Sequence, residues 1–226
     1  MEFEKLVRSR RSVRGYQHKP VPRNIIEDII SIAKRAPSSM NTQPWHVHVV
    51  AGEALDRVRT GNTKKMLAGA PVKRDIATHG AYEGVHRKRQ VEIAVQLFEA
   101  MGIARDDKER RQDWVMRGFR QFDAPVSLVL CYDKELDPGA VCHFDLGAIC
   151  YGIVLAAWDR GLGTVVNGQG IMQSGVVREV AQIPKSQNIM TCIAMGYPDD
   201  SFSANSVTSR REDNDSFVRY VGFDDD

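Results

Sequence analysis

Three arginines and one serine lie within five consecutive residues near the start of the chain, in the segment Arg10-Arg11-Ser12-Val13-Arg14. Guanidinium groups bind phosphate through paired hydrogen bonds, so this segment could hold a phosphate group. Taken alone, the run is better explained as a solvated basic face. Nucleic-acid binding is disfavoured, because no aromatic residues interrupt the run and the formal net charge of the chain is +2. Arg210 could add a further phosphate ligand, although spacing alone does not show it.

A polar loop between two prolines is the second segment that could bind a ligand. It runs from Pro37 to Pro44, just before Trp45, and it carries two serines and the amides of Asn41 and Gln43. These groups donate and accept hydrogen bonds, as a polar ligand requires. By itself, an ordinary interhelix loop followed by a core tryptophan is the simpler explanation.

Several glycines surround a predicted strand end, but they do not form a dinucleotide-binding loop. Neither Gly161-Leu162-Gly163 nor Gly168-Gln169-Gly170 is followed by the third glycine that such a loop requires. Instead, Val166-Asn167-Gly168-Gln169 indicates a strand end at which the small glycine lets the backbone approach a flat ligand.

Motifs for hydrolysis and for metal binding are missing from the sequence. It contains no Gly-x-Ser-x-Gly nucleophile elbow, no Gly-x-x-x-x-Gly-Lys phosphate loop and no His-Glu-x-x-His zinc motif. His46 and His48 would share one face of a strand, where solvent-facing or core histidines are expected more often than a metal pair. The four cysteines form no Cys-x-x-Cys pair and are expected to be reduced and buried.

The hydrophobic pattern places these segments among alternating helices and strands. Helices are predicted over 22–35, 53–66, 82–101, 106–119 and 146–158, and strands over 46–50, 126–131, 164–167 and 189–195. The helix over 146–158 is apolar nearly all round, which is typical of a central helix. Strands separated by long helices favour an α/β or α+β fold, in one domain spanning 1–226. The polar stretch over about 198–226 is expected to extend along another surface, such as that of a partner subunit.

The bulk properties indicate an ordinary globular protein. Of the 226 residues, 42% are hydrophobic and 27% are charged. No apolar run approaches the roughly 20 residues that span a bilayer, and the first residues lack the apolar core of a secretion signal. We therefore expect a cytoplasmic protein with no membrane partner and no nucleic-acid partner.

Taken together, these segments resemble the nitroreductase family of flavoproteins. The resemblance rests on five motifs in series: Arg10–Arg14, Ala36–Trp45, the apolar helix over 145–158 with Gly161-Leu162-Gly163-Thr164, Met195-Gly196-Tyr197-Pro198, and Ser209-Arg210-Arg211. Each motif is modest alone, but five in this order are specific and span nearly the whole chain. The resemblance implies an α+β fold with a mixed, mostly antiparallel sheet flanked by helices. It also implies an intertwined homodimer whose C-terminal extension lies on the partner.

The resemblance further implies which residues surround bound FMN. The phosphate and the polar edge of the flavin would be held by Arg10, Arg11, Ser12, Arg14 and Arg210. The residues that would reach FMN from the other subunit are Pro37, Ser38, Ser39 and Asn41. The segment that would line the flavin near N5, with a backbone N–H bonded to it, is Val166, Asn167, Gly168 and Gln169.

The chemistry implied by the family needs no catalytic side chain, because the flavin carries it. NADH or NADPH would give a hydride to FMN and leave, and a small aromatic acceptor would then take two electrons at the same face. The loop and tail motifs look most like those of members that reduce nitroaromatic compounds to nitroso and hydroxylamine products. Chemistry carried by the flavin agrees with the absence of a nucleophile motif from the sequence.

Some positions depart from the family pattern and leave the acceptor open. Gly168 stands where many members carry a glutamate, and the stretch 60–120, which should contain the substrate lid, matches no member closely. Within it, Arg87-Lys88-Arg89 could favour an acidic aromatic, although a solvated helix face is the simpler interpretation. A reductive dehalogenase or another flavin enzyme of the family is one alternative, and a non-catalytic flavin-binding sensor is another.

Overall fold

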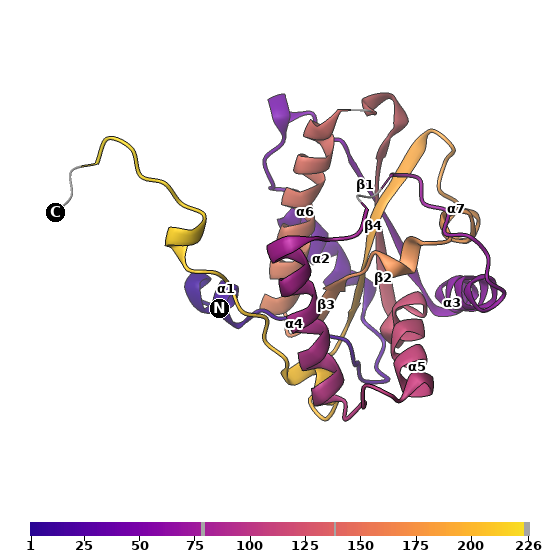
Figure 1. Ribbon diagram of the computed structural model, residues 1–226. Helices are drawn as coiled ribbons and strands as arrows, with labels where there is room; N and C mark the ends of the chain where they lie inside the picture. Colours follow the sequence, from indigo (N-terminus) through magenta and orange to yellow (C-terminus); the bar gives the residue numbers. More distant parts are fainter. Residues whose placement is uncertain (78–79, 138, 224–226) are drawn as a thin grey trace.

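A four-stranded sheet forms the centre of the computed structural model, which describes residues 1–77, 80–137 and 139–223 (Figure 1). The strands are β1 (Trp45–Ala51), β2 (Val126–Asp133), β3 (Gly163–Val166) and β4 (Gln187–Gly196), in the order β1-β2-β4-β3. All neighbouring strands pair antiparallel, and a parallel bridge between Ser12 and Thr164 adds the N-terminal segment beside β3. The predicted α+β class and mostly antiparallel sheet are confirmed.

Helices cover both faces of the sheet (Figure 1). One face is covered by α2 (Arg23–Ala33) and α6 (Ala140–Asp159), and the other by α3 (Gly52–Leu67) and α7 (Ser174–Val180). The other helices described are α1 (Phe3–Ser9), α4 (Gly84–Ala100) and α5 (Lys108–Phe119). Successive side chains of the buried strand β2 point to opposite faces. Leu128 and Leu130 join the cluster formed by α2 and α6, whereas Val129 and Cys131 join the cluster formed by α3 and α7.

Two helices differ from the sequence prediction. Helix α6 begins at Ala140, six residues before the predicted start at 146. The prediction started too late because His143 and Asp145 interrupt the apolar pattern in the sequence, although Asp145 is buried in the structure. Helix α7 was not predicted. It is only seven residues long and buries only Ser174 and Val177, so it gives a weak periodic signal.

Helix α6 also corrects the expectation about membrane spans. It is long and apolar enough to cross a membrane by length and composition, since its two acidic residues, Asp145 and Asp159, do not offset its many apolar residues. The core helix of a globular protein passes the same test, and α6 packs against α2, β1, β2 and β3. The strictly apolar run used for the sequence prediction was too narrow a criterion.

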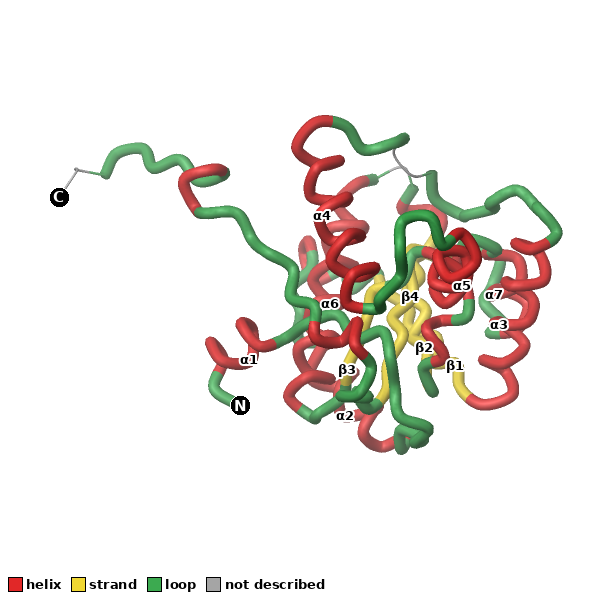
Figure 2. Tube along the Cα trace, turned by 60° about the horizontal axis from the view of Figure 1, so that its bottom comes forward, coloured by secondary structure: helices red, strands yellow, loops and turns green. Residues whose placement is uncertain are grey.

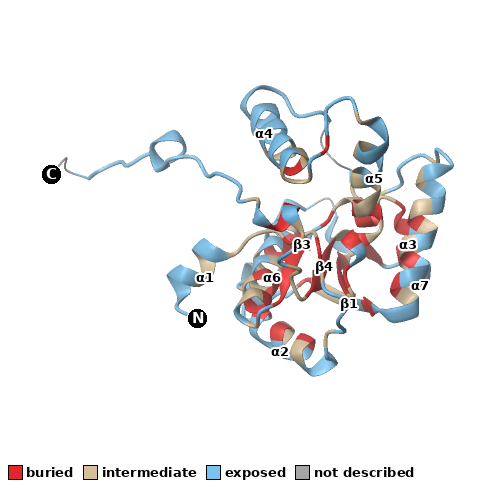
Figure 3. Cartoon of the chain, turned by 90° about the horizontal axis from the view of Figure 1, so that it is seen from below, coloured by how far each residue is buried: buried red, intermediate tan, exposed pale blue. Residues whose placement is uncertain are grey.

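The stretch predicted to contain a lid forms an outer layer with few buried residues. Helix α4 buries only Leu97, and Figure 3 shows it as an exposed helix set apart from the buried sheet. Helix α5 buries Gly118 and Phe119 at its C-terminal end, where it meets the body of the protein. Within this stretch, α4 is thus solvated along most of its length, whereas the C-terminal end of α5 is packed on the body of the protein.

The chain after β4 first packs on the N-terminal segment and then leaves the body of the protein (Figures 1 and 2). Ala204 and Asn205, in the turn η5 (Ser203–Ser206), are buried. From Thr208 onward the chain is almost entirely exposed, including the turn η6 (Asn214–Ser216). The tail predicted over about 198–226 therefore has a packed first part, and its residues 224–226 lie outside the described residues.

Candidate active site

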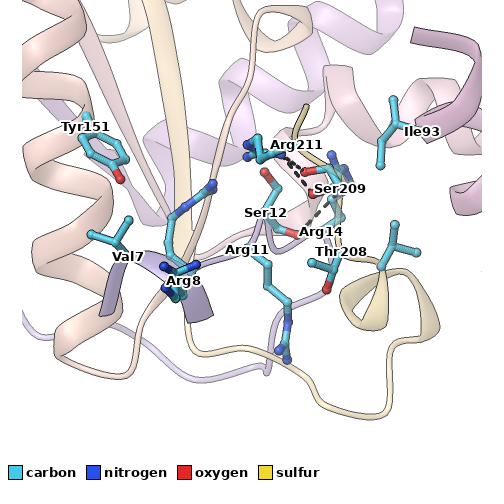
Figure 4. A pocket seen from close by; sticks show the side chains of 12 residues that line it. Val7, Arg8, Arg11, Ser12, Arg14, Ile93, Tyr151, Thr208, Ser209 and Arg211 are labelled. Atoms are coloured by element: carbon cyan, nitrogen blue, oxygen red, sulfur yellow. Dashed lines mark hydrogen bonds between the residues drawn. The ribbon is translucent and has the colours of Figure 1, made fainter. Parts of the chain in front are cut away.

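The arginine segment lines a pocket of about 560 Å³, which we call the arginine pocket (Figure 4). Its lining residues come from α1, the following segment, α4, α6 and the tail: Val7, Arg8, Arg10, Arg11, Ser12, Arg14, Ile93, Tyr151, Val207, Thr208, Ser209 and Arg211. Of the five residues predicted to bind the phosphate and polar edge of a flavin, four are thus brought together: Arg10, Arg11, Ser12 and Arg14.

Pairing with β3 fixes the direction of these side chains. The Val13 N–H donates to the Thr164 carbonyl at 2.9 Å, and the Val13 side chain is fully buried. A Cβ atom at Gly163 would lie 2.5 Å from a Val13 methyl carbon, so the close approach needs glycine there. Because neighbours alternate along an extended segment, Ser12 and Arg14 point away from the core and line the pocket.

The arginine pocket holds positive charge without matching negative charge. The Nε atoms of Arg10 and Arg11 are buried and have no hydrogen-bond partner among the described residues. Burial lowers the pKa of the Arg14 guanidinium, with the nearby Tyr16 opposing the shift. None of the described lining residues is acidic. Buried cations are costly unless they are paired, so this pocket suits an anion such as a phosphate.

Asn205 fixes the backbone of the arginine segment from the other end of the chain. Its side-chain oxygen accepts hydrogen bonds from the N–H groups of Arg14 at 2.7 Å and Gly15 at 3.2 Å. Its amide donates to the carbonyls of Gly15 at 2.8 Å and Asp199 at 2.9 Å. The buried Asn205 side chain therefore bonds to two backbone N–H groups and two backbone carbonyls, and it joins the tail to a segment 191 residues earlier in the sequence.

Arg117 of α5 holds the same segment from the side of the lid. Its Nη2 donates to the Arg14 carbonyl at 3.0 Å, and its guanidinium stacks over the Phe202 ring at 4.7 Å. Phe202 in turn packs on Gly15, where a Cβ atom would lie 2.2 Å from the ring carbon Cγ. The lid helix, the tail and the arginine segment are therefore connected around Arg14.

A second cavity of about 450 Å³ opens where β3 ends, and we call it the Gly168 chamber. Its lining residues are Arg74, Ile76, Ala77, His143, Leu146, Gly147, Cys150, Val166, Gly168, Ile171, Ile189, Met190 and Thr191. Its size falls within the range of small-molecule sites, and most of its walls are apolar. Of the predicted strand-end residues, Val166 and Gly168 line it.

The other two strand-end residues bond to the protein itself. The Asn167 N–H donates to the Cys192 carbonyl at 2.7 Å, and its side-chain amide donates to the Gly118 carbonyl at 2.8 Å. The Gln169 N–H donates to the Asn167 side-chain oxygen at 3.1 Å. The Gly168 N–H, in contrast, makes no hydrogen bond with any described residue. It is the strand-end donor left for a ligand.

The polar loop lies apart from both cavities within one chain. Ser39 donates its N–H to the Asp145 carboxylate at 3.1 Å, and the Ser38 hydroxyl accepts from the Gln43 N–H at 2.9 Å. Pro37, Ser38, Ser39 and Asn41 line neither the arginine pocket nor the Gly168 chamber. Their predicted contact with the flavin of another subunit stays a prediction.

The tail contributes a different arginine from the one predicted. Arg211 lines the arginine pocket, whereas Arg210 lines a neighbouring cavity with Arg89 and Glu92 of α4. Sequence reasoning also gave no site role to Arg74 or Asn205. Arg211 was signalled by its position next to Arg210. The sequence gave no indication of a role for Asn205, because a single asparagine in a polar tail belongs to no motif.

Among the described residues, no cluster of three histidine, cysteine or acidic side chains could hold a metal ion. His46 lies 3.0 Å from Asp133, and His48 lies 2.8 Å from Gln187, so each imidazole is engaged with a protein side chain. All four cysteines are free thiols. The chemistry of the site therefore centres on the two cavities.

Comparison with known proteins decides the family. The family model described as "Nitroreductase family" matches residues 7–197. The chain belongs to the nitroreductase family. It is 35% identical to a chloronitrobenzene nitroreductase of Comamonas testosteroni and 34% identical to a nitrobenzene nitroreductase of Ectopseudomonas oleovorans. Each alignment covers 97% of this chain and 96% of the relative. The resemblance inferred from the sequence is confirmed.

Solved structures agree with this assignment. The FMN- and NADPH-dependent nitroreductase NfnB from Sphigopyxis sp. strain HMH superposes with a TM-score of 0.93 at 27% identity, covering 99% of this chain and 100% of that chain. The FMN-dependent nitroreductase NfnB from Mycobacterium smegmatis, in complex with NADPH, gives a TM-score of 0.89 at 27% identity, covering 96% and 97%. The whole described fold of this family member is therefore shared with flavin-dependent nitroreductases.

Proposed function

We propose that this chain is an FMN-dependent oxidoreductase that uses NADH or NADPH to reduce nitroaromatic compounds. The observation that carries the proposal is the arginine pocket, where buried Nε atoms of Arg10 and Arg11 have no partner. A phosphate ester supplies the charged oxygens that these groups need. Relatives named chloronitrobenzene and nitrobenzene nitroreductases support a nitroaromatic acceptor. The solved NfnB nitroreductases, which are described as FMN-dependent, support FMN as the cofactor.

The strand β3 relates the proposed phosphate site to the proposed ring site. Thr164 pairs with Ser12 beside the arginine pocket, and β3 ends at Val166 beside the Gly168 chamber. Arg10, Arg11, Ser12 and Arg14 would bind the phosphate and polar edge of FMN, with Arg211 or Arg210 from the tail. Val166 and Gly168 would face the flat ring.

Bound FMN would supply hydride acceptance from NAD(P)H and two-electron transfer to the acceptor. The protein would supply position and charge. The free Gly168 N–H would donate a hydrogen bond to the ring near N5, and the desolvated charge of Arg14 would stabilise negative charge on its polar edge. Because these cations and dipoles are preorganised, no nucleophilic side chain is required.

We place this reaction in the cytoplasm. Its proposed hydride donors are cytoplasmic metabolites, and the four cysteines are free thiols, as is usual in a reducing compartment. The acceptor is expected to be a small aromatic compound because the Gly168 chamber is small and mostly apolar.

A homodimer is part of the proposal, because one chain leaves apolar surface uncovered. Phe144 and Tyr151 of α6 are 79% and 47% exposed. The tail residues Phe217 and Tyr220 are 68% and 69% exposed, away from the body of their own chain (Figure 1). Large apolar side chains exposed in this number are typical of a protein–protein contact. A partner would also bring the loop 37–41 to the flavin.

Removing the tail is expected to weaken the dimer and FMN binding together. A chain ending at Glu212 keeps Asn205 and Arg211 but loses Phe217, Tyr220 and Phe223, which would cover the partner. Sedimentation velocity on wild type and truncated protein measures the oligomeric state, with flavin absorbance followed in the same run. A wild-type monomer that carries FMN would contradict the shared site.

Purified wild-type protein is expected to show an oxidised-flavin spectrum, or to acquire one when FMN is added. Under anaerobic conditions NADH or NADPH should bleach it, and nitrobenzene should then restore it. Difference spectra and product analysis for nitroso and hydroxylamine compounds measure both half-reactions. Protein that stays colourless with FMN present would refute the proposal. Bound flavin that neither nicotinamide bleaches would support a flavin sensor instead.

A further inference from the structure

A guanidinium group from the segment between α3 and α4 lies over the Gly168 chamber. A Cβ atom placed on Gly168 would be 3.4 Å from Nη1 and 3.7 Å from Nη2 of Arg74. The glycine that replaces the family's frequent glutamate therefore leaves room for this cation. Arg74 and Gly168 are far apart in sequence, so the fold brings them together.

The backbone on both sides of Arg74 is firmly anchored. The Lys73 N–H donates to the Met172 carbonyl at 2.9 Å, and the Lys73 carbonyl accepts from the Ser174 N–H at 3.0 Å. On the other side, the Asp75 carboxylate accepts from the Ile189 N–H at 2.9 Å and pairs with Arg178. Arg74 is thus presented to the chamber by a fixed segment, as a preorganised binding group requires.

Arg74 has no anionic partner in the described part of the chain. Its guanidinium makes no hydrogen bond or ion pair there, in contrast to Arg178. Burial lowers the pKa of Arg74, which shows that the charged form is partly desolvated. No described lining residue of the chamber is acidic. The chamber therefore holds a cation whose desolvation is not compensated within the described residues.

The remaining walls of the chamber suit an aromatic ring. Ile171, Ile189 and Met190 come from one side and Leu146 from α6. His143 also lines the chamber, but its Nε2 is 3.8 Å from the Asp137 carboxylate, which is not part of the lining. Arg74 is consequently the permanently charged group in a cavity whose other lining residues are mostly apolar.

We propose that the Gly168 chamber takes the acceptor as an aromatic carboxylate, with Arg74 pairing the carboxylate and the apolar walls packing the ring. This inference rests on the proposed function, because it makes the chamber the acceptor side of the flavin site. A carboxylate matches a guanidinium in charge and in planar two-point geometry. A neutral nitro group matches the geometry alone, and the flavin phosphate has its own cations in the arginine pocket.

Binding of benzoate to the oxidised FMN-loaded protein tests the proposal, because benzoate cannot be reduced there. Benzamide is the neutral probe of the same shape. In Arg74→Met, the Kd for benzoate is expected to rise about 30-fold, as for loss of a charge-assisted hydrogen bond, and the Kd for benzamide by less than about 3-fold. Arg74→Lys should keep part of the preference. Arg87→Met, which removes an exposed cation bonded only to Gln90, is the matched control and should change neither Kd.

Isothermal titration calorimetry gives these constants, and FMN affinity is measured for each variant. Equal weakening of benzoate and benzamide, or no benzoate binding by wild type, would overturn the inference. Loss of FMN affinity in Arg74→Met would also overturn it, because Arg74 would then serve the flavin. Nitrobenzene reduction by the wild type is assayed separately. If the wild type reduces nitrobenzene but does not bind benzoate, this inference alone is refuted. If the wild type does not reduce nitrobenzene, the result counts against the proposed function.

Discussion

Replacing Arg14 with methionine is expected to weaken FMN binding by about 10- to 150-fold. This range corresponds to the roughly 1.5–3 kcal/mol that a hydrogen bond to a charged group contributes. Arg14 is half-buried, its pKa is lowered by burial, and it lines the arginine pocket with Arg10 and Arg11. The apoprotein should be as stable as wild type or slightly more stable, because methionine removes an uncompensated buried charge while keeping much of the packing volume. Titration of apoprotein with FMN, followed by flavin fluorescence quenching, measures the affinity.

Arg8→Met is the matched control for this prediction. Arg8 lines the same pocket, but its side chain is 77% exposed and is already paired with Glu4 at 2.8 Å. Exposed ion pairs of this kind contribute little, so FMN affinity should change by less than about 3-fold. Equal losses in the two variants would indicate diffuse attraction by the basic surface instead of a specific contact. Unfolding of Arg14→Met would indicate that Arg14 has a structural role, contrary to this prediction.

The parts of the fold that the sequence predicted are those with a strong local pattern. The apolar residues of α2 recur on one helical face, which is the pattern that predicted a helix over 22–35, and Ile26, Ile29 and Ala33 on that face are buried. The arginine segment was recognisable because its members are consecutive, so a single extended stretch delivers them to one pocket. The strand end at 166–169 was also placed correctly along the chain, although only Val166 and Gly168 line the chamber.

The parts that the sequence could not predict depend on contacts between distant segments. Arg74 lies in a stretch of weak hydrophobic pattern, and its place over Gly168 follows from hydrogen bonds of Lys73 and Asp75 to residues about 100 positions away. The choice of Arg211 over Arg210 at the pocket depends on how the tail turns. Neither spacing nor residue type determines these arrangements, because both arginines have the same chemistry.

Asn205→Ala is expected to lower the free energy of unfolding by about 3 kcal/mol and to weaken FMN binding. Alanine would leave the N–H groups of Arg14 and Gly15 without their acceptor, in a place where Asn205 itself is buried. The Gly15 carbonyl would still accept from the Asp199 N–H at 3.1 Å. Each buried group left unsatisfied costs about 1–3 kcal/mol, and the effects of neighbours are not additive. For a chain of this length, the melting temperature should fall by roughly 6–12 °C.

Ser206→Ala is the matched control for Asn205→Ala, since Ser206 is the next residue in the same turn. Ser206 is exposed, and its hydroxyl donates only to the Ser203 carbonyl at 2.7 Å, so stability should change by less than about 0.5 kcal/mol. Urea denaturation followed by circular dichroism measures both variants as apoproteins, and FMN titration follows on the folded protein. If Asn205→Ala were as stable as the control, water would have to satisfy the two backbone N–H groups. If it were destabilised but bound FMN normally, Asn205 would hold the fold together without positioning Arg14, because the arginine segment would keep its place through Val13, Thr164 and Arg117 alone.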